Sequence, residues 1–349
     1  MTALPRLAVL LALLALAGCA PPRDTLLGQA APAAAAGTAV PLERVLPERM
    51  RPAALNPQVL AISGGGPDGA FGAGWVAGSL REGTLGSPDI VTGVSIGAVI
   101  ALLAILGEDA ALEEVFTGPQ VAALGVDQQL PALVFGGTAS SGRALDALVA
   151  GLVTEERLAA LAREHARGRR LFIGTTDHDA MRPVIWDVTA MAAAAGPAAG
   201  PAVADVLRAS MSIPGIFRPV ALAGGPGGTR LHGDGGLTAQ FALPRMPGER
   251  PPSSETVIVN LRLLSDPPSD NLGGIDAGRR AAITLIRAAT RDQVTLAALR
   301  AAQRGTGFRA IPLPPDLRAL PLDERRPERL ARSFERGVRL AGEIGPAGP

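Results

Sequence analysis

The feature that constrains this chain most is a GxSxG motif at residues 93–97, with Ser95 at its centre. Residues 89–92 before it predict a short strand. Residues 98–106 after it are apolar, contain neither glycine nor proline, and predict a buried helix. A GxSxG turn between a strand and a helix holds a serine hydroxyl exposed at the edge of a sheet. The pattern therefore predicts an α/β fold with a nucleophilic Ser95. The alternative is a tight glycine turn in which Ser95 only fills space.

Two more glycine-rich segments accompany this motif. One follows an apolar strand pattern at residues 59–63 and offers several backbone N–H groups to an oxyanion; the candidates are Gly64, Gly65, Gly66 and Gly69. The other begins with Asp234, which follows a strand pattern at residues 229–232 and offers a carboxylate beside the serine. A nucleophile, a charge stabiliser and a base are the minimum set for acyl transfer.

Length and composition restrict the classes of function. A chain of 349 residues with 47% hydrophobic residues can form one large α/β domain. The formal charge is +1 and no basic stripe with interleaved aromatic residues is present, so nucleic acid is not an expected partner. The single cysteine, Cys19, excludes an internal disulfide. No group of cysteine, histidine and acidic residues has metal-ligand spacing, and we expect neither a metal nor an organic cofactor.

The N-terminus predicts export and lipid anchoring. Residues 1–18 contain one charge, Arg6, followed by an apolar run at residues 7–17 that is short for a membrane span and typical of a signal peptide. The run ends in Leu-Ala-Gly before Cys19, which closely resembles the lipobox of bacterial lipoproteins. We therefore expect a lipidated Cys19 and a protein anchored in the bacterial cell envelope, at the outer membrane or periplasmic face in a Gram-negative host. The alternative is an ordinary secretory signal with an incidental cysteine.

The rest of the chain predicts a tether and one enzyme domain. Residues 19–55 are rich in alanine and proline and predict a flexible tether, and residues 56–349 predict a single domain without internal repeats. Residues 184–188 predict an antiparallel partner at the sheet edge, and the low-complexity run 192–201 predicts a surface loop. Helices are expected at 70–80, 98–106, 144–166, 203–210, 275–304 and 324–344, and further strands at 170–176, 256–264 and 308–313.

Four segments together resemble the bacterial patatin-like phospholipases, and residues 175–177 with residues 182–187 are also similar to a stretch of the family's lipoprotein-type members. Residues 60–74 resemble the family's oxyanion loop and the helix after it, and residues 92–98 its nucleophile elbow. Residues 209–217, which include Pro214, resemble its SIPG segment, and residues 232–236 its DGG box. The resemblance covers about residues 58–345 in the same order and spacing. It implies a three-layer α/β/α fold with a mainly parallel central sheet.

The resemblance also implies a Ser–Asp dyad that cleaves fatty-acyl esters of phospholipids or lysophospholipids. Ser95 would attack the ester, Asp234 would accept the serine proton, and backbone N–H groups of Gly65, Gly66 and Ile96 would hold the oxyanion. The glycines and the proline that support these motifs would be Gly93, Gly97, Gly235, Gly236 and Pro214. One departure is Asp68, which stands where many members carry a basic residue, and it bears on rate and substrate preference.

The sequence leaves two other hypotheses of function open. One is an esterase with a Ser–His–Asp triad, for which the chain offers only His165, His178 and His232, none of them after Asp234. The other is a catalytically silent envelope lipoprotein that binds lipid. An aspartate base with an ordinary pKa of about 3.9 would retain activity below pH 6.5, where a histidine base would lose it.

Overall fold

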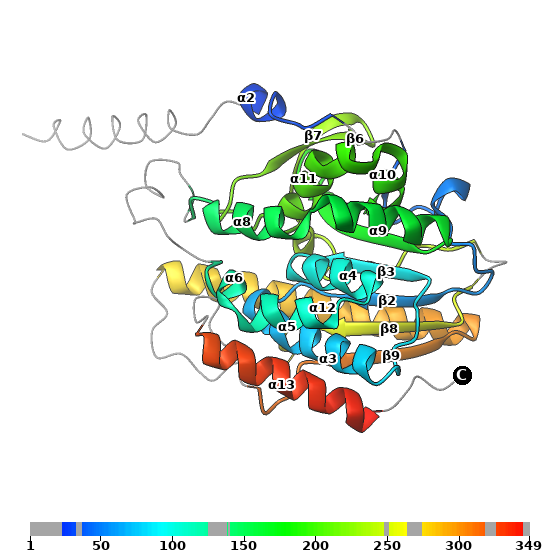
Figure 1. The fold of residues 1–349 in the computed structure, drawn as a ribbon. Coiled ribbons are helices and arrows are strands. Elements are labelled where there is room, and N and C mark those ends of the chain that lie inside the picture. Colours follow the sequence, from blue (N-terminus) through cyan, green and yellow to red (C-terminus); the bar gives the residue numbers. More distant parts are fainter. Residues whose placement is uncertain are drawn as a thin grey trace, which may run out of the picture.

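The computed structural model describes residues 23–32, 37–124, 138, 140–247, 251–263, 274–317 and 326–344. At its centre five neighbouring strands run parallel, as the two strand–glycine–helix patterns predict (Figure 1). In spatial order they are β4 (Arg170–Asp177), β3 (Ile90–Val94), β2 (Gln58–Ile62), β8 (Ser254–Val259) and β9 (Gly307–Pro312).

Antiparallel strands extend this parallel core beyond β4. β5 (Arg182–Asp187) pairs with β4, which confirms the expected antiparallel partner, but the edge is β1 (Ala39–Pro41), which pairs with β5. The hairpin of β6 (Val220–Gly225) and β7 (Gly228–Asp234) joins the carboxyl end of β4, where Thr175 is opposite Asp234. Since β4 also pairs with β3, this hairpin places the end of β7 close to Ser95.

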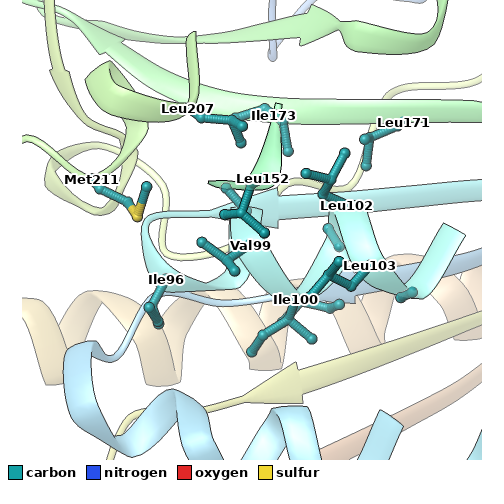
Figure 2. Packing of buried hydrophobic residues seen from close by; sticks show 14 of the residues in the cluster. Ile96, Val99, Ile100, Leu102, Leu103, Leu152, Leu171, Ile173, Leu207 and Met211 are labelled. Atoms are coloured by element: carbon teal, nitrogen blue, oxygen red, sulfur yellow. The ribbon is translucent and has the colours of Figure 1, made fainter. Parts of the chain in front are cut away.

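Alternating side chains of the strands feed two apolar layers. Leu60 and Ile62 of β2 belong to the larger cluster, and Val59 and Ala61 face the opposite side. In Figure 2, residues of α4 such as Val99 and Leu102 pack near Leu171 and Ile173 of β4 and Leu207 of α11. Helices of the larger layer are α3 (Gly69–Arg81), α4 (Ile96–Leu106), α5 (Asp109–Thr117), α6 (Pro119–Ala122), α8 (Arg143–Leu152), α9 (Glu155–Ala166), α10 (Val188–Ala195), α11 (Gly200–Ser210) and α13 (Pro327–Ile344).

The opposite face of the sheet is covered by α12 (Gly274–Arg304) through Ala297 and Val294, and elsewhere by residues Leu46 and Met50. Figure 1 shows α12 behind the parallel strands and α3 and α13 in front of them. The expected three-layer α/β/α fold with a mainly parallel sheet is therefore confirmed.

Part of the predicted tether is folded. Residues 39–41 form strand β1, and Leu46 and Met50 are each only 1% exposed against the sheet. The prediction of a flexible segment is wrong for residues 37–55, because isolated apolar residues there fill one face of the sheet without any helical or strand period. Residues 1–22, which include Cys19 and the predicted signal peptide, lie outside the described residues.

Two local predictions also need correction. The single helix expected at 144–166 is two helices, because Thr154 caps α9: its hydroxyl accepts the N–H of Arg157 at 3.2 Å. The loop expected at 192–201 is the end of α10, a 3₁₀ turn and the start of α11, with Ala199 fully buried. Alanine is the strongest helix former, so a low-complexity alanine run is a poor indicator of a loop.

Residues 188–210 are long and apolar enough to cross a membrane, but the run is broken at Gly196–Pro197.

Candidate active site

Ser95 occupies a sharp turn between β3 and α4. Its backbone has φ 55° and ψ −130°, a conformation that residues other than glycine rarely adopt. Two glycines make this turn possible by close packing. A Cβ on Gly93 would lie 2.3 Å from the carbonyl oxygen of Gly97, and a Cβ on Gly97 would lie 2.5 Å from that of Ser63. A strained serine backbone with glycine, which has no side chain, two positions before and after it is typical of a nucleophile elbow.

The fold brings Ser95 and Asp234 together from positions 139 residues apart. The Ser95 hydroxyl donates to Oδ2 of Asp234 at 2.6 Å, and both residues are almost fully buried. The N–H of Gly236 donates to Oδ1 of Asp234 at 2.8 Å. Burial raises the pKa of Asp234 to about 6, although the hydrogen bonds from Ser95 and Gly236 act in the opposite direction. This carboxylate is therefore a better proton acceptor than an ordinary aspartate.

The glycine loop before α3 contains two kinds of glycine. Within the described part of the chain, the N–H groups of Gly65, Gly66 and Ile96 donate no hydrogen bond. Gly65 and Gly66 have φ values of 152° and 57°, and Gly66 lines a pocket with Ser95. The N–H of Gly64 donates to the carbonyl of Gln240 at 3.1 Å, and that of Gly69 is used within the 3₁₀ turn. Gly64 and Gly69 are therefore not free donors for an oxyanion, contrary to expectation.

Hydrogen bonds with Ser210 and Asn260 hold the turn at Ser95 and the glycine loop in place. The Ser210 hydroxyl accepts the N–H of Ser95 at 2.9 Å and donates to the carbonyl of Gly174 at 2.7 Å. The Asn260 side chain donates to the carbonyl of Ser63 at 2.9 Å, and the Asn260 N–H donates to the Ser63 hydroxyl at 2.9 Å. A Cβ on Gly65 would lie 2.7 Å from Asn260, so the loop rests directly on this residue.

Gln240 connects the glycine loop with the turn that carries Asp234. Its carbonyl accepts the N–H of Gly64, and its side-chain amide donates to the carbonyl of Gly236 at 2.5 Å. Gln293 of α12 fixes this position from the opposite face, because its side chain accepts the N–H of Gln240 at 3.0 Å and donates to the carbonyl of Phe241 at 2.7 Å. The oxyanion loop and the carboxylate are thus held in one hydrogen-bonded unit.

None of the three histidines forms a hydrogen bond with Ser95 or Asp234. His232 is buried beside Trp186, its Nδ1 lies 2.9 Å from the Thr175 hydroxyl, and burial lowers its pKa to about 4. His178 packs over Gly233, where an added Cβ would lie 2.3 Å from its Nε2. His165 lies on α9. The geometry therefore offers no Ser–His–Asp triad.

The pocket beside Ser95 is apolar. Apart from Ser95, it is lined by Gly66, Pro67, Ile96, Val121, Leu124, Leu145, Met211, Ile213 and Phe217.

Pro214 is exposed at the tip of the neighbouring turn, where the N–H of Ile216 donates to the carbonyl of Ile213 and Gly215 has a φ of 80°. Pro214 thus shapes the turn and is not among the residues that line the pocket of Ser95. Within the part of the chain that the structure describes, no cluster of three or more histidine, cysteine or acidic residues is placed to bind a metal.

The sequence matches the family described as patatin-like phospholipase over residues 60–244, more than half of the chain. The matched range includes Ser95, Asp234 and the glycine loop between β2 and α3. The chain belongs to the patatin-like phospholipase family. Among solved structures, VipD from Legionella pneumophila is similar, with 11% identity over 84% of this chain and 68% of that one and a TM-score of 0.36. No curated protein matches the sequence.

In this patatin-like phospholipase family member, no sequence motif singles out the residues that hold the loops. Ser210, Gln240 and Asn260 are polar and almost fully buried, and each follows or interrupts an apolar stretch. A buried polar side chain next to a glycine motif is a usable signal, because such a group needs a hydrogen-bond partner. Membership of the family supports a lipid hydrolase.

Proposed function

We propose that this protein is a serine acyl hydrolase that cleaves fatty-acyl esters of phospholipids or lysophospholipids through Ser95 and Asp234. The observation that carries the proposal is the 2.6 Å hydrogen bond from the Ser95 hydroxyl to the buried Asp234 carboxylate. It lies beside a pocket whose apolar lining matches the chemistry of an acyl chain, and beside backbone N–H groups at the start of α4. Family membership supports the lipid substrate.

In the first half-reaction, Oγ of Ser95 attacks the ester carbonyl while its proton passes to Oδ2 of Asp234. The negative charge that develops on the carbonyl oxygen is met by the N–H groups of Gly65, Gly66 and Ile96. The positive end of the α4 dipole acts in the same direction. Collapse of the tetrahedral intermediate breaks the bond to the alcohol, which leaves with the proton from Asp234, and Ser95 carries the acyl group.

In the second half-reaction, water attacks the acyl-enzyme and Asp234 takes its proton. The new tetrahedral intermediate collapses, the fatty acid leaves, and the proton returns to Oγ of Ser95. The raised pKa of Asp234 favours both proton transfers from oxygen, because it narrows the gap between the acid and the hydroxyl group.

The test is hydrolysis of a short-chain ester and of a phospholipid by the wild type and matched variants. Ser95→Ala and Asp234→Asn are expected to reduce kcat/KM by about 10³-fold or more. His178→Ala and His232→Gln serve as controls and are expected to stay within about tenfold of the wild type. A wild type without ester hydrolysis would favour the silent lipid-binding protein. A folded histidine variant with a 10³-fold loss would favour a triad.

We also propose that Cys19 is lipidated and anchors the mature enzyme in the bacterial cell envelope. The support is the apolar run at residues 7–17, which ends within the Leu-Ala-Gly-Cys motif at residues 16–19. Intact mass and membrane fractionation of the wild type and of Cys19→Ser test this. An unmodified N-terminal Cys19, or a Cys19→Ser protein that fractionates like the wild type, would contradict the proposal.

A further inference from the structure

A second cavity of about 530 Å³ lies next to the apolar pocket of Ser95. The two share Leu145 of α8 and Phe217, so these side chains form the boundary between them. The loop after α11 serves both sites. Met211 and Ile213 line the pocket of Ser95, whereas Ser212 lines the cavity. The cavity is within the size range of small-molecule sites.

The lining of this cavity, unlike that of the pocket, is polar and charged. Its polar and charged members are Gln29, Thr138, Ser140, Ser141, Asp146, Asp205, Arg208, Ser212 and Arg218. Three of them form a cluster in which Nε of Arg208 donates to Asp146 at 2.7 Å and its Nη1 donates to Asp205. Asp205 also accepts the N–H of Ala31, from the segment after α2 (Arg23–Leu27), at 3.3 Å. Two carboxylates and one guanidinium give this cluster a formal charge of −1.

Arg218 is the second guanidinium of the cavity. It is exposed, and no carboxylate among the described residues forms an ion pair with it. The cavity thus presents a lone positive group and a cluster of net negative charge, and its charged side chains sum to zero. A ligand that carries one negative and one positive group complements this pattern.

We propose that this cavity binds the zwitterionic head group of a phospholipid substrate, an inference that rests on the proposed lipase function. Arg218 contacts the phosphodiester, and the cluster of Asp146, Asp205 and Arg208 contacts the ammonium group. With the acyl chain in the apolar pocket and the ester at Ser95, the alcohol part of the substrate extends across Leu145 and Phe217 into the cavity. Guanidinium groups recognise phosphate by charge-assisted hydrogen bonds, and carboxylates do the same for ammonium.

The test compares kcat/KM on an ethanolamine phospholipid, a glycerol phospholipid with net negative charge, and p-nitrophenyl butyrate, which has no head group. Both lipids are presented in the same neutral detergent micelles. In Arg218→Gln the ratio of phospholipid to butyrate kcat/KM is expected to fall about tenfold for both lipids, as for one charge-assisted contact. In Asp146→Asn the preference for the ethanolamine lipid over the glycerol lipid is expected to fall about threefold. The control is Arg332→Gln, an exposed residue on α13 across the molecule from the cavity.

Three outcomes would overturn the inference, and they are distinguishable. A wild type that cleaves butyrate but neither phospholipid removes the proposed lipid substrate and the inference with it. A wild type that cleaves phospholipids while Arg218→Gln keeps the wild-type ratio removes the inference alone. An equal change in Arg332→Gln would show a general surface-charge effect in place of a head-group site.

Discussion

Asp234→Asn is expected to stabilise the folded protein at neutral pH while it abolishes hydrolysis. Burial raises the pKa of Asp234 from 3.8 to about 6. Each pKa unit corresponds to about 1.4 kcal/mol, so holding this carboxylate ionised costs the folded state about 3 kcal/mol at pH 7. Asparagine is uncharged and can keep both hydrogen bonds, because its oxygen accepts from Gly236 and its amide group donates to Ser95.

The expected gain in stability depends on pH, because the cost arises only while Asp234 is ionised. Above about pH 6, Asp234 is ionised in both the folded and the unfolded chain, and the folded state carries the full cost. As the pH falls through 6 the folded state binds the proton first, and the cost disappears once the pH is well below both pKa values, 3.8 and about 6. The free energy of unfolding of Asp234→Asn is therefore expected to exceed that of the wild type by about 3 kcal/mol at pH 7.5 and by only about 1 kcal/mol at pH 4.5.

Guanidinium chloride unfolding at the two pH values measures both differences. Asp187, whose pKa burial also raises to about 6, is present in both proteins and cancels in the comparison. Ser95→Ala is the matched control, because it removes activity but keeps the buried carboxylate and should gain no such stability. If Asp234→Asn is no more stable than the wild type at pH 7.5, or if its advantage is the same at pH 4.5, the reasoning about burial is refuted.

The other predictions concern rate. The raised pKa of Asp234 is expected to make kcat/KM fall about tenfold per pH unit below about pH 6. An aspartate base with an ordinary pKa would instead keep its activity well below pH 6.5. A profile of kcat/KM from pH 4.5 to 9 measures the difference. Gly65→Ala is expected to lower kcat by about 10²–10³-fold, because a Cβ there meets Asn260 and displaces an oxyanion donor, and steady-state kinetics with a thermal melt test it. Ser210→Ala leaves the buried N–H of Ser95 without its acceptor and is expected to lower kcat about tenfold at similar KM, whereas Ser210→Thr should retain part of the rate. Asp68→Lys is expected to keep or raise activity, and a large loss in the same assay would give Asp68 a positive role.

The sequence by itself determined the local chemistry of this protein. The strand–GxSxG–helix pattern is decided by short-range sterics, since Gly93 and Gly97 allow the tight approach that Ser95 needs, and the elbow forms where predicted. Apolar runs likewise located the parallel strands and most helices. The alanine run at 192–201 misled because composition alone does not say whether a segment is buried.

Only the tertiary structure decided how these pieces work together. The strand order places β7 against β4 and so brings Asp234 to Ser95, a contact that no local pattern specifies. Hydrogen bonds to Gln240 and within the 3₁₀ turn remove Gly64 and Gly69 from the set of free donors. Burial, a property of the whole packed sheet, sets the pKa of Asp234 near 6. Each of these depends on groups distant in the chain, whereas the motifs depend on neighbours along it.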